Sequence, residues 1–200
     1  LQEVRSHNRK LEKHFTRWPD LDQANYLTPD GYEAVYRTNA VTRHGEHGNA
    51  LLSRWPVIGT QHSDVSDHRF EQRGLLHVQI LIDGIEVHVV VVHLGLIHAS
   101  RARQVQRLGE YIATGVPETA PLIVAGDFND WGQQLKRMLA GFSLYEFEEP
   151  RAFTYPARLP LTQLDHVYAR GLTPLSLHVP RGRIWWRMSD HLPLIAEFRL

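Results

Sequence analysis

Cysteine is absent from the 200-residue chain. Without thiols the protein has no disulfide bonds, no thiol catalysis and no cysteine-based zinc site. Long apolar runs are also missing. The longest β-branched run, residues 89–92, has the length of a strand, whereas a bilayer span needs roughly 18–20 apolar residues. No signal peptide is recognisable from Leu1 onward, and we expect a cytoplasmic location.

Neither sign of charge is in excess, because 22 lysines and arginines balance 22 aspartates and glutamates. Proteins that bind nucleic acid through many phosphates usually have a basic excess, so the overall charge does not favour a nucleic-acid partner. The C-terminal part is nevertheless basic, which favours a phosphate-bearing substrate. From residue 151 onward seven arginines stand against three acidic residues: Arg151, Arg158, Arg170, Arg181, Arg183, Arg187 and Arg199 against Asp165, Asp190 and Glu197.

Length and composition indicate one layered domain over residues 1–200, with the 42% hydrophobic and 22% charged content of a soluble globular protein. Asp-Gly between two β-rich runs, residues 74–82 and 85–94, is a strong hairpin signal. Strands outnumber helices and several are continuously apolar, which predicts α/β sheets covered on both faces. Residues 99–113 have helical periodicity, with Ala102, Val105, Leu108 and Ile112 on the apolar face and Arg101, Arg103, Gln104 and Arg107 largely off it.

The N-terminal quarter has weaker signals. We expect the end of a strand at residues 1–4 and an amphipathic surface helix over residues 5–18, in which Leu11 and Phe15 lie four apart. Residues 43–48 are predicted to form a polar loop that precedes a buried strand.

Residues 122–130, with the sequence Leu-Ile-Val-Ala-Gly-Asp-Phe-Asn-Asp, place a carboxylate and a carboxamide at the end of a short buried strand. Strand ends hold functional groups more rigidly than free loops do, so Asp127 and Asn129 are candidate site residues. A structural alternative is that they only form an Asx turn and cap the segment that follows. Similar polar clusters elsewhere in the chain favour the functional interpretation.

Each of the other clusters also has an ordinary explanation. Glu3 suits a surface carboxylate near a helix start, and His93 suits a satisfied strand histidine in a chain with 13 histidines. Asp165 could form an ion pair with a nearby arginine. Asp190 and His191 could cap a loop. Taken together, the clusters would collect four carboxylates, two histidines and a carboxamide at one edge of a sheet.

Such a set of side chains has a chemical meaning. Oxygen donors without thiolates suit Mg²⁺ or Mn²⁺, and Mg²⁺ is commonly held by one or two carboxylates, waters and substrate phosphate oxygens. A histidine beside a carboxylate is fixed in one tautomer, so it can act as a general base or stabilise charge on a phosphoryl oxygen. Metal, base and cationic donors together are typical of phosphoester hydrolysis.

Five motifs, in order and spacing, resemble those of the endonuclease/exonuclease/phosphatase family, which includes DNase I-like nucleases, sphingomyelinase-type phosphodiesterases and inositol phosphatases. They are Gln2-Glu3, His93-Leu94, Gly126-Asp127-Phe128-Asn129, Leu164-Asp165-His166 and Ser189-Asp190-His191. Residues 48–54 and 93–96 are most similar to small bacterial uncharacterised hydrolases on the sphingomyelinase-like side. The resemblance implies a four-layer α/β sandwich, with two packed mixed sheets flanked by helices.

The resemblance further implies Mg²⁺ as the cofactor, with Mn²⁺ as the alternative. Glu3 would be the principal metal ligand, and Asp190 would help to hold the metal or a water. The family also has an asparagine on a strand just upstream of the Gln-Glu motif, whereas this sequence begins at Leu1. Loss of an internal strand leaves backbone groups unpaired, so we expect the domain to be N-terminally incomplete and to lack its first strand.

Catalytic roles follow from the same resemblance. Asp127 and Asn129 would position the attacking water and the phosphate, and His93 would donate a hydrogen bond to a phosphate oxygen. His191, oriented by Asp165, would act either as the base or as a donor that stabilises charge.

Residues 181–187, with three arginines and two tryptophans, precede the Asp190-His191 motif. Arginines can bind phosphates, and tryptophans can stack on bases or lie at a lipid interface. The structural alternative is that a tryptophan packs in the core and the arginines are solvated. The candidate substrate-binding residues are Asn49, Arg183, Trp186 and Arg187.

Three functions are therefore compatible with the sequence. A Mg²⁺-dependent phosphodiesterase or phosphatase for a small or lipid-linked phosphoester ranks first. A DNA or RNA nuclease ranks second, because neutral charge weighs against processive binding to nucleic acid. A non-catalytic phosphate-binding module ranks third, since binding alone does not need all of these polar residues. The expected partner is the phosphoester substrate; nucleic acid and peripheral membrane contact stay open, and no obligate protein partner is indicated.

Overall fold

The computed structural model describes residues 1–14, 16, 17, 19–147 and 151–200. They fall into two compact units, Leu1–His93 and Leu94–Leu200, called here the first and second units. The single domain expected over residues 1–200 stays a prediction. Among the described helices, none combines the length and the apolar character that crossing a membrane requires.

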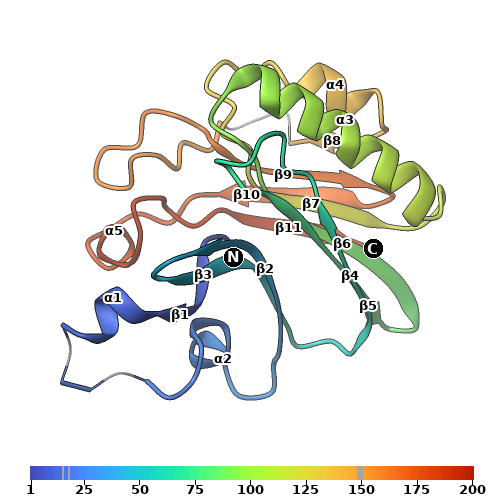
Figure 1. Ribbon diagram of the computed structural model, residues 1–200. Coiled ribbons are helices and arrows are strands. Elements are labelled where there is room, and N and C mark those ends of the chain that lie inside the picture. Colours follow the sequence, from blue (N-terminus) through green and yellow to red (C-terminus); the bar gives the residue numbers. More distant parts are fainter. Residues whose placement is uncertain (15, 18, 148–150) are drawn as a thin grey trace. The chain divides into compact units, whose positions relative to one another are not determined.

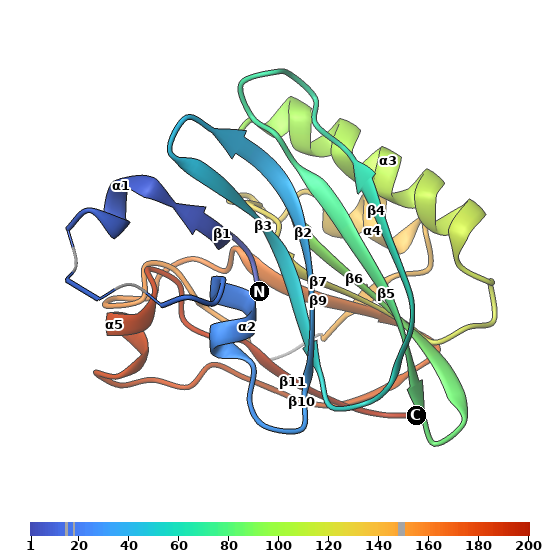
Figure 2. The same cartoon turned by 60° about the horizontal axis from the view of Figure 1, so that its bottom comes forward.

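The described part of the first unit is built from two antiparallel ladders and two short helices (Figures 1 and 2). One ladder has the order β1-β3-β2, and the other runs β4-β5-β6. The strands are β1 (Val4–Asn8), β2 (Glu33–Thr42), β3 (Gly45–Ser53), β4 (Val57–Asp64), β5 (Gly74–Ile82) and β6 (Ile85–His93), and the helices are α1 (Arg9–Glu12) and α2 (Gln23–Leu27).

The predicted β5–β6 hairpin is confirmed, with Ile82 paired to Ile85. Its turn residues Asp83 and Gly84 both have positive φ, 49° and 83°, as a two-residue turn of this kind requires. One face of the hairpin carries a hydrophobic core cluster of the unit, and most residues of the opposite face are buried as well. This core consists of Val35, Leu76, Val78, Ile80, Val87, Val89 and Val91.

The helix expected over residues 5–18 is wrong. Residues Val4–Asn8 form β1, which pairs with β3 so that Arg5 lies opposite His47, and only the single turn of α1 is helical. Burial of Val4 and pairing with β3 outweigh a weak helical periodicity. Phe15, half of the expected apolar pair, lies outside the described residues. The predicted loop at residues 43–48 is also shorter, because β3 already begins at Gly45.

The second unit is held by two antiparallel arrangements, in which β9 lies between β7 and β8, and β10 pairs with β11. The predicted helix at 99–113 is confirmed as α3. The strands are β7 (Leu122–Asp127), β8 (Tyr145–Glu146), β9 (Asp165–Arg170), β10 (Thr173–His178) and β11 (Ile195–Arg199), and the helices are α3 (His98–Gly115), α4 (Lys136–Ala140) and α5 (Trp185–Met188).

Candidate active site

The predicted site residues are divided between the two units. Glu3, Asn49 and His93 belong to the first unit. The second unit holds the larger group, which consists of Asp127, Asn129, Asp165, Arg183, Trp186, Arg187, Asp190 and His191.

In the second unit, Asp127 and Asp165 lie directly opposite each other at the ends of β7 and β9. Directly paired residues of antiparallel strands project to the same face of a sheet, so the two carboxylates share that face. The pairing arises because the register runs without a bulge from Leu122, opposite Arg170, to this end. Two motifs that lie far apart in the sequence therefore meet at one point.

His191 lies against both of these carboxylates. Its Nδ1 is 2.7 Å from Asp165 Oδ2, and its Nε2 is 3.9 Å from Asp127 Oδ2. Thr154 Oγ1 donates a hydrogen bond of 2.6 Å to the same Asp165 oxygen. With Asp165 accepting from Nδ1–H, the imidazole is held in one orientation and its Nε2 faces Asp127.

The surroundings of His191 favour its charged form. Burial of the ring lowers the pKa of His191, but the hydrogen bond to Asp165 and the negative charges of Asp165, Asp127 and Asp190 outweigh that effect. The pKa is therefore raised above the ordinary value for histidine. A protonated imidazole of this kind can donate to a phosphoryl oxygen, and after losing its proton it is a correspondingly stronger base.

The Asx turn considered as a structural alternative for residues 127–129 is present in the structure. The backbone N–H of Asn129 donates to Asp127 Oδ1 at 2.8 Å, while the other oxygen of Asp127 faces His191. Asn129 has a φ of 49° and its amide donates to the carbonyl of Leu94 at 3.0 Å. The turn thus fixes Asp127 for contact with His191, so the structural and functional interpretations are compatible.

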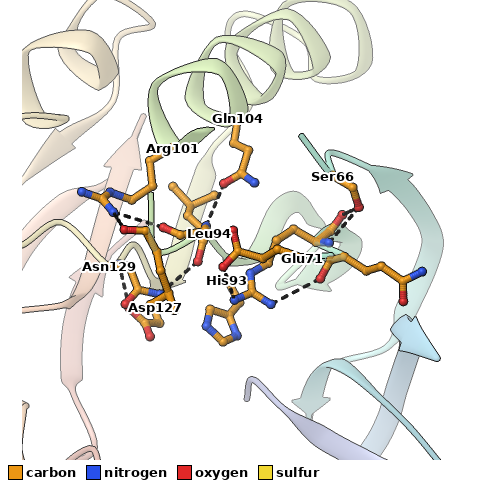
Figure 3. A network of polar contacts seen from close by, with 12 residues as sticks. Ser66, Glu71, His93, Leu94, Arg101, Gln104, Asp127 and Asn129 are labelled. Atoms are coloured by element: carbon orange, nitrogen blue, oxygen red, sulfur yellow. Dashed lines mark hydrogen bonds and ion pairs between the residues drawn. The ribbon is translucent and has the colours of Figure 1, made fainter. Parts of the chain in front are cut away.

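The loop that follows His93 in the chain is held by two residues of α3 that the sequence analysis placed off the buried face (Figure 3). Arg101 and Gln104 are 4% and 0% exposed, which corrects that prediction. Gln104 Oε1 accepts from the N–H of Gly95 at 2.8 Å, and Arg101 donates to the carbonyls of Gly95 and Leu96. These hydrogen bonds position the loop that contains Leu94, whose carbonyl accepts the hydrogen bond from the amide of Asn129.

In the first unit, Glu3 lies beside His93, with 4.0 Å between Glu3 Oε1 and His93 Nδ1. The Glu3 side chain is 61% exposed, whereas that of His93 is only 10% exposed. Glu3 also has a φ of 53°, a conformation that is costly for a non-glycine residue and that is enriched at functional sites. It precedes β1 rather than lying within a strand, which corrects the expectation for residues 1–4.

Asn49, predicted to contact substrate, is fully buried in β3. Its amide donates to the carbonyls of Gly74 and Val91 at 3.0 and 3.1 Å, so it ties β3 to β5 and β6. A side chain with no exposed surface has no free face for a substrate, and its position supports a structural role instead.

In each unit the predicted metal-binding side chain is a carboxylate, a donor type that suits a hard cation. Among the residues that the structure describes, no three histidine, aspartate or glutamate side chains gather to hold a metal ion. Mg²⁺ does not need such a cluster, because it keeps several waters and takes one or two carboxylates plus phosphate oxygens. Glu3 in the first unit and Asp190 in the second unit each have an exposed carboxylate, and the donor type of each, taken by itself, suits Mg²⁺.

The predicted substrate residues of the second unit lie on and around α5. Arg183 and Arg187 are exposed, and Trp186 is partly exposed with the guanidinium of Arg158 4.8 Å from its ring centre. Trp186 is therefore not a fully buried core residue, as the structural alternative proposed for one of the tryptophans would require.

Aromatic residues beside His191 were missed by the sequence analysis. The ring of Tyr155 is centred 4.9 Å from that of His191, and Trp131 meets Tyr155 edge-on at 5.7 Å. Trp131 directly follows the 122–130 segment, which was a usable signal. Tyr155 and Thr154 lie in an irregular segment without periodicity, where no signal pointed to them.

Comparisons with known proteins show the family of this chain. The model of the Endonuclease/Exonuclease/phosphatase family matches residues 1–191. Uncharacterized protein YbhP of Escherichia coli K12 is 36% identical over 208 aligned residues, which cover 100% of this chain and 82% of that protein.

Two solved structures show the fold. A mannosyl-6-phosphatase from Bacteroides thetaiotaomicron has a TM-score of 0.69 at 16% identity, with 86% of this chain and 78% of that chain covered. TDP2 from D. rerio, complexed with a single-strand DNA product, has a TM-score of 0.64 at 16% identity, with 85% of this chain and 78% of that chain covered. These similarities confirm the predicted α/β, DNase I-like class of fold.

Proposed function

Because the chain belongs to the endonuclease/exonuclease/phosphatase family, whose members hydrolyse phosphoester bonds, we propose that it is a Mg²⁺-dependent phosphodiesterase or phosphatase. The proposed substrate is a small or lipid-linked phosphoester. The observation that carries the proposal is the contact of His191 with both Asp165 and Asp127. A module that only binds phosphate does not need a histidine held between two carboxylates.

In the proposed reaction, the side chains of the second unit orient water and move a proton. Asp165, itself held by Thr154, fixes the ring of His191. Asp127 orients the attacking water, while Asn129 holds Asp127 through its backbone N–H. His191 Nε2 then either takes the proton of that water or donates to a phosphoryl oxygen.

Residues of the first unit supply further proposed roles. Glu3 is the proposed principal metal ligand, and His93 is the proposed donor to a phosphate oxygen. Asp190, in the second unit, is proposed to help hold the metal or a water. Bound Mg²⁺ would polarise the phosphoryl group and stabilise the leaving alkoxide. The cofactor and the cytoplasmic location both stay predictions.

A nuclease is the second candidate. It is favoured by the basic composition from Arg151 onward and by the structural likeness to a protein solved with a single-strand DNA product. The balanced overall charge weighs against extended binding to nucleic acid, so this candidate ranks below the first.

A substrate panel tests the proposal. We would assay the full chain on plasmid DNA, a lysophospholipid, sphingomyelin, a chromogenic phosphodiester and a chromogenic phosphomonoester, each with Mg²⁺, Mn²⁺ or EDTA. We expect metal-dependent turnover that Asp127→Ala abolishes and that the exposed control Asp30→Ala retains. Turnover of plasmid DNA alone would favour the nuclease, and no turnover of any ester would contradict hydrolysis.

A further inference from the structure

A cavity of about 450 Å³ opens beside Asp190 within the second unit. It is lined by residues 156–159 and by residues 186–190, which include the end of α5. This volume is in the range of small-molecule sites, roughly 300–1,000 Å³. Its lining includes Arg158, Leu159, Trp186, Arg187, Met188 and Asp190.

The lining is mainly apolar, and some of its largest side chains are open to solvent. Leu159 and Met188, from its two walls, are 65% and 67% exposed. Leu161 and Ile184, each two positions in the sequence from a lining residue, are similarly exposed at 67% and 66%. Single exposed apolar residues are ordinary, but exposed apolar side chains from both walls of one cavity favour a binding surface.

Two arginines stand within this apolar lining. Arg158 places its guanidinium over the ring of Trp186, and Arg187 lies one residue further along α5. Asp190 is the single acidic residue among the lining side chains. The cavity therefore combines an apolar wall with cationic groups, as a ligand with an apolar part and an anionic part requires.

Backbone hydrogen bonds connect the cavity to the reacting groups. The N–H of Ala157 donates to the carbonyl of Asp190 at 2.7 Å, and the N–H of Leu192 donates to the carbonyl of Thr154 at 2.8 Å. Tyr155, which directly precedes the cavity loop, contacts the ring of His191. A ligand held in the cavity is thus adjacent to the segment that carries His191.

We propose that this cavity binds the apolar part of an amphiphilic phosphoester, such as one with an alkyl chain, while Arg158 and Arg187 pair with its phosphate. This inference rests on the proposed function and names the class of substrate. In the reaction, a bond forms between the water oxygen and phosphorus, and the ester P–O bond breaks. The proton lost by the water ends on the released alcohol.

A chain-length series tests the proposal. Alkyl 4-nitrophenyl phosphodiesters, from methyl to decyl, would be assayed as monomers with Mg²⁺. We expect kcat/KM to rise by about twofold to fourfold for each added methylene until the cavity is filled, since burying a methylene is worth about 0.8 kcal/mol. Leu159→Asp and Met188→Asp should each lower the decyl-to-methyl ratio of kcat/KM by about tenfold or more, a direction that follows from the lost apolar wall.

Leu175 provides the matched control, because it is an exposed leucine, 58% accessible, on β10 and outside the cavity lining. Leu175→Asp should leave the chain-length dependence unchanged. Binding of decylphosphonate and methylphosphonate, measured by calorimetry in EDTA, gives a readout without turnover. We expect tighter binding of the decyl compound, and Leu159→Asp should remove the difference.

The two proposals fail in distinguishable ways. Hydrolysis that is independent of chain length, with equal binding of both phosphonates, would overturn the cavity proposal and leave the proposed function standing. Absence of hydrolysis, combined with Leu159-dependent preference for decylphosphonate, would support the cavity as a binding site and contradict the hydrolase.

Discussion

At the level of single residues, the predicted site residues of the two units show unusual backbone conformations, and those of the second unit also concentrate charge. Glu3 and Asn129 both adopt positive φ, which is sparsely populated for residues other than glycine. His191 meets the charges of three aspartates, of which Asp165 and Asp127 contact its ring. Both features were invisible in the sequence, because a motif gives the types and order of residues but neither their dihedral angles nor their distances.

Asp165→Asn tests the electrostatic account of His191. The change removes the negative charge that accepts from Nδ1, so burial and the more distant charges then determine the pKa. We expect the pKa of His191 to fall relative to the wild-type protein, as measured by NMR titration of its ring protons. Glu197→Gln is the control, because it alters an exposed carboxylate of the same unit that is hydrogen-bonded to Ser176. This variant should leave the pKa of His191 unchanged. An unchanged His191 titration in Asp165→Asn would contradict the account.

At the level of elements, strong local signals predicted structure well and weak ones did not. The Asp83-Gly84 hairpin and α3 follow from turn chemistry and helical period. The pairing of β1 with β3 depends on residues some forty positions away, which no local window contains. Arg101 and Gln104 were predicted to lie largely off the apolar face of α3. They share the helical spacing of Leu108 and are buried, and the loop at residues 94–96 supplies their hydrogen-bond partners.

Gln104→Leu measures what the contact between α3 and this loop contributes. The substitution leaves the buried N–H of Gly95 without its acceptor, which typically costs about 1–3 kcal/mol. Gln106→Leu is the matched control on the same helix, because Gln106 is exposed and pairs only with Glu110 at i, i+4; we expect a change below about 0.5 kcal/mol. The free energy of unfolding of both variants is measured in urea. Equal losses of unfolding free energy would show that the contact between Gln104 and the loop contributes no more to stability than the exposed Gln106–Glu110 pair.

At the level of the whole molecule, family and fold class followed from five short motifs, because their order is preserved along nearly the entire chain. The substrate did not follow, since fold and catalytic residues are shared by proteins that act on different phosphoesters. The cavity beside Asp190 is formed by two segments, residues 156–159 and 186–190, that the sequence separates by about 30 positions. Its apolar lining becomes recognisable only when both segments are seen together.

Stability of the chain should depend on pH through a buried histidine pair in the first unit. His77 Nε2 and His88 Nδ1 are 2.8 Å apart, and both side chains are 1% exposed. Burial, followed by the neighbouring His88, lowers the pKa of His77 from 6.5 to about 4. The unfolded chain therefore binds a proton more readily, so the stabilising effect of neutral His77 is complete above pH 6.5 and is lost as the pH falls toward 4.

His77→Gln tests this linkage, because glutamine keeps hydrogen-bonding atoms but does not titrate. We expect the variant to lose less unfolding free energy than the wild type between pH 6.5 and pH 4, with a difference of up to roughly 3 kcal/mol. His98→Gln, at an exposed histidine of α3, should follow the wild-type curve. Parallel curves for His77→Gln and the wild type would rule out the linkage.

The most direct test of the central claim is the steady-state rate of phosphoester hydrolysis by the wild type and by His191→Ala, each with Mg²⁺ and with EDTA. The substrate is the ester that gives turnover in the panel. We predict Mg²⁺-dependent hydrolysis by the wild type and a loss of at least about 100-fold in kcat for His191→Ala, with urea unfolding confirming that the variant is folded. Equal rates for the two proteins, or no hydrolysis by the wild type, would contradict the claim that His191, held between Asp165 and Asp127, serves phosphoester hydrolysis.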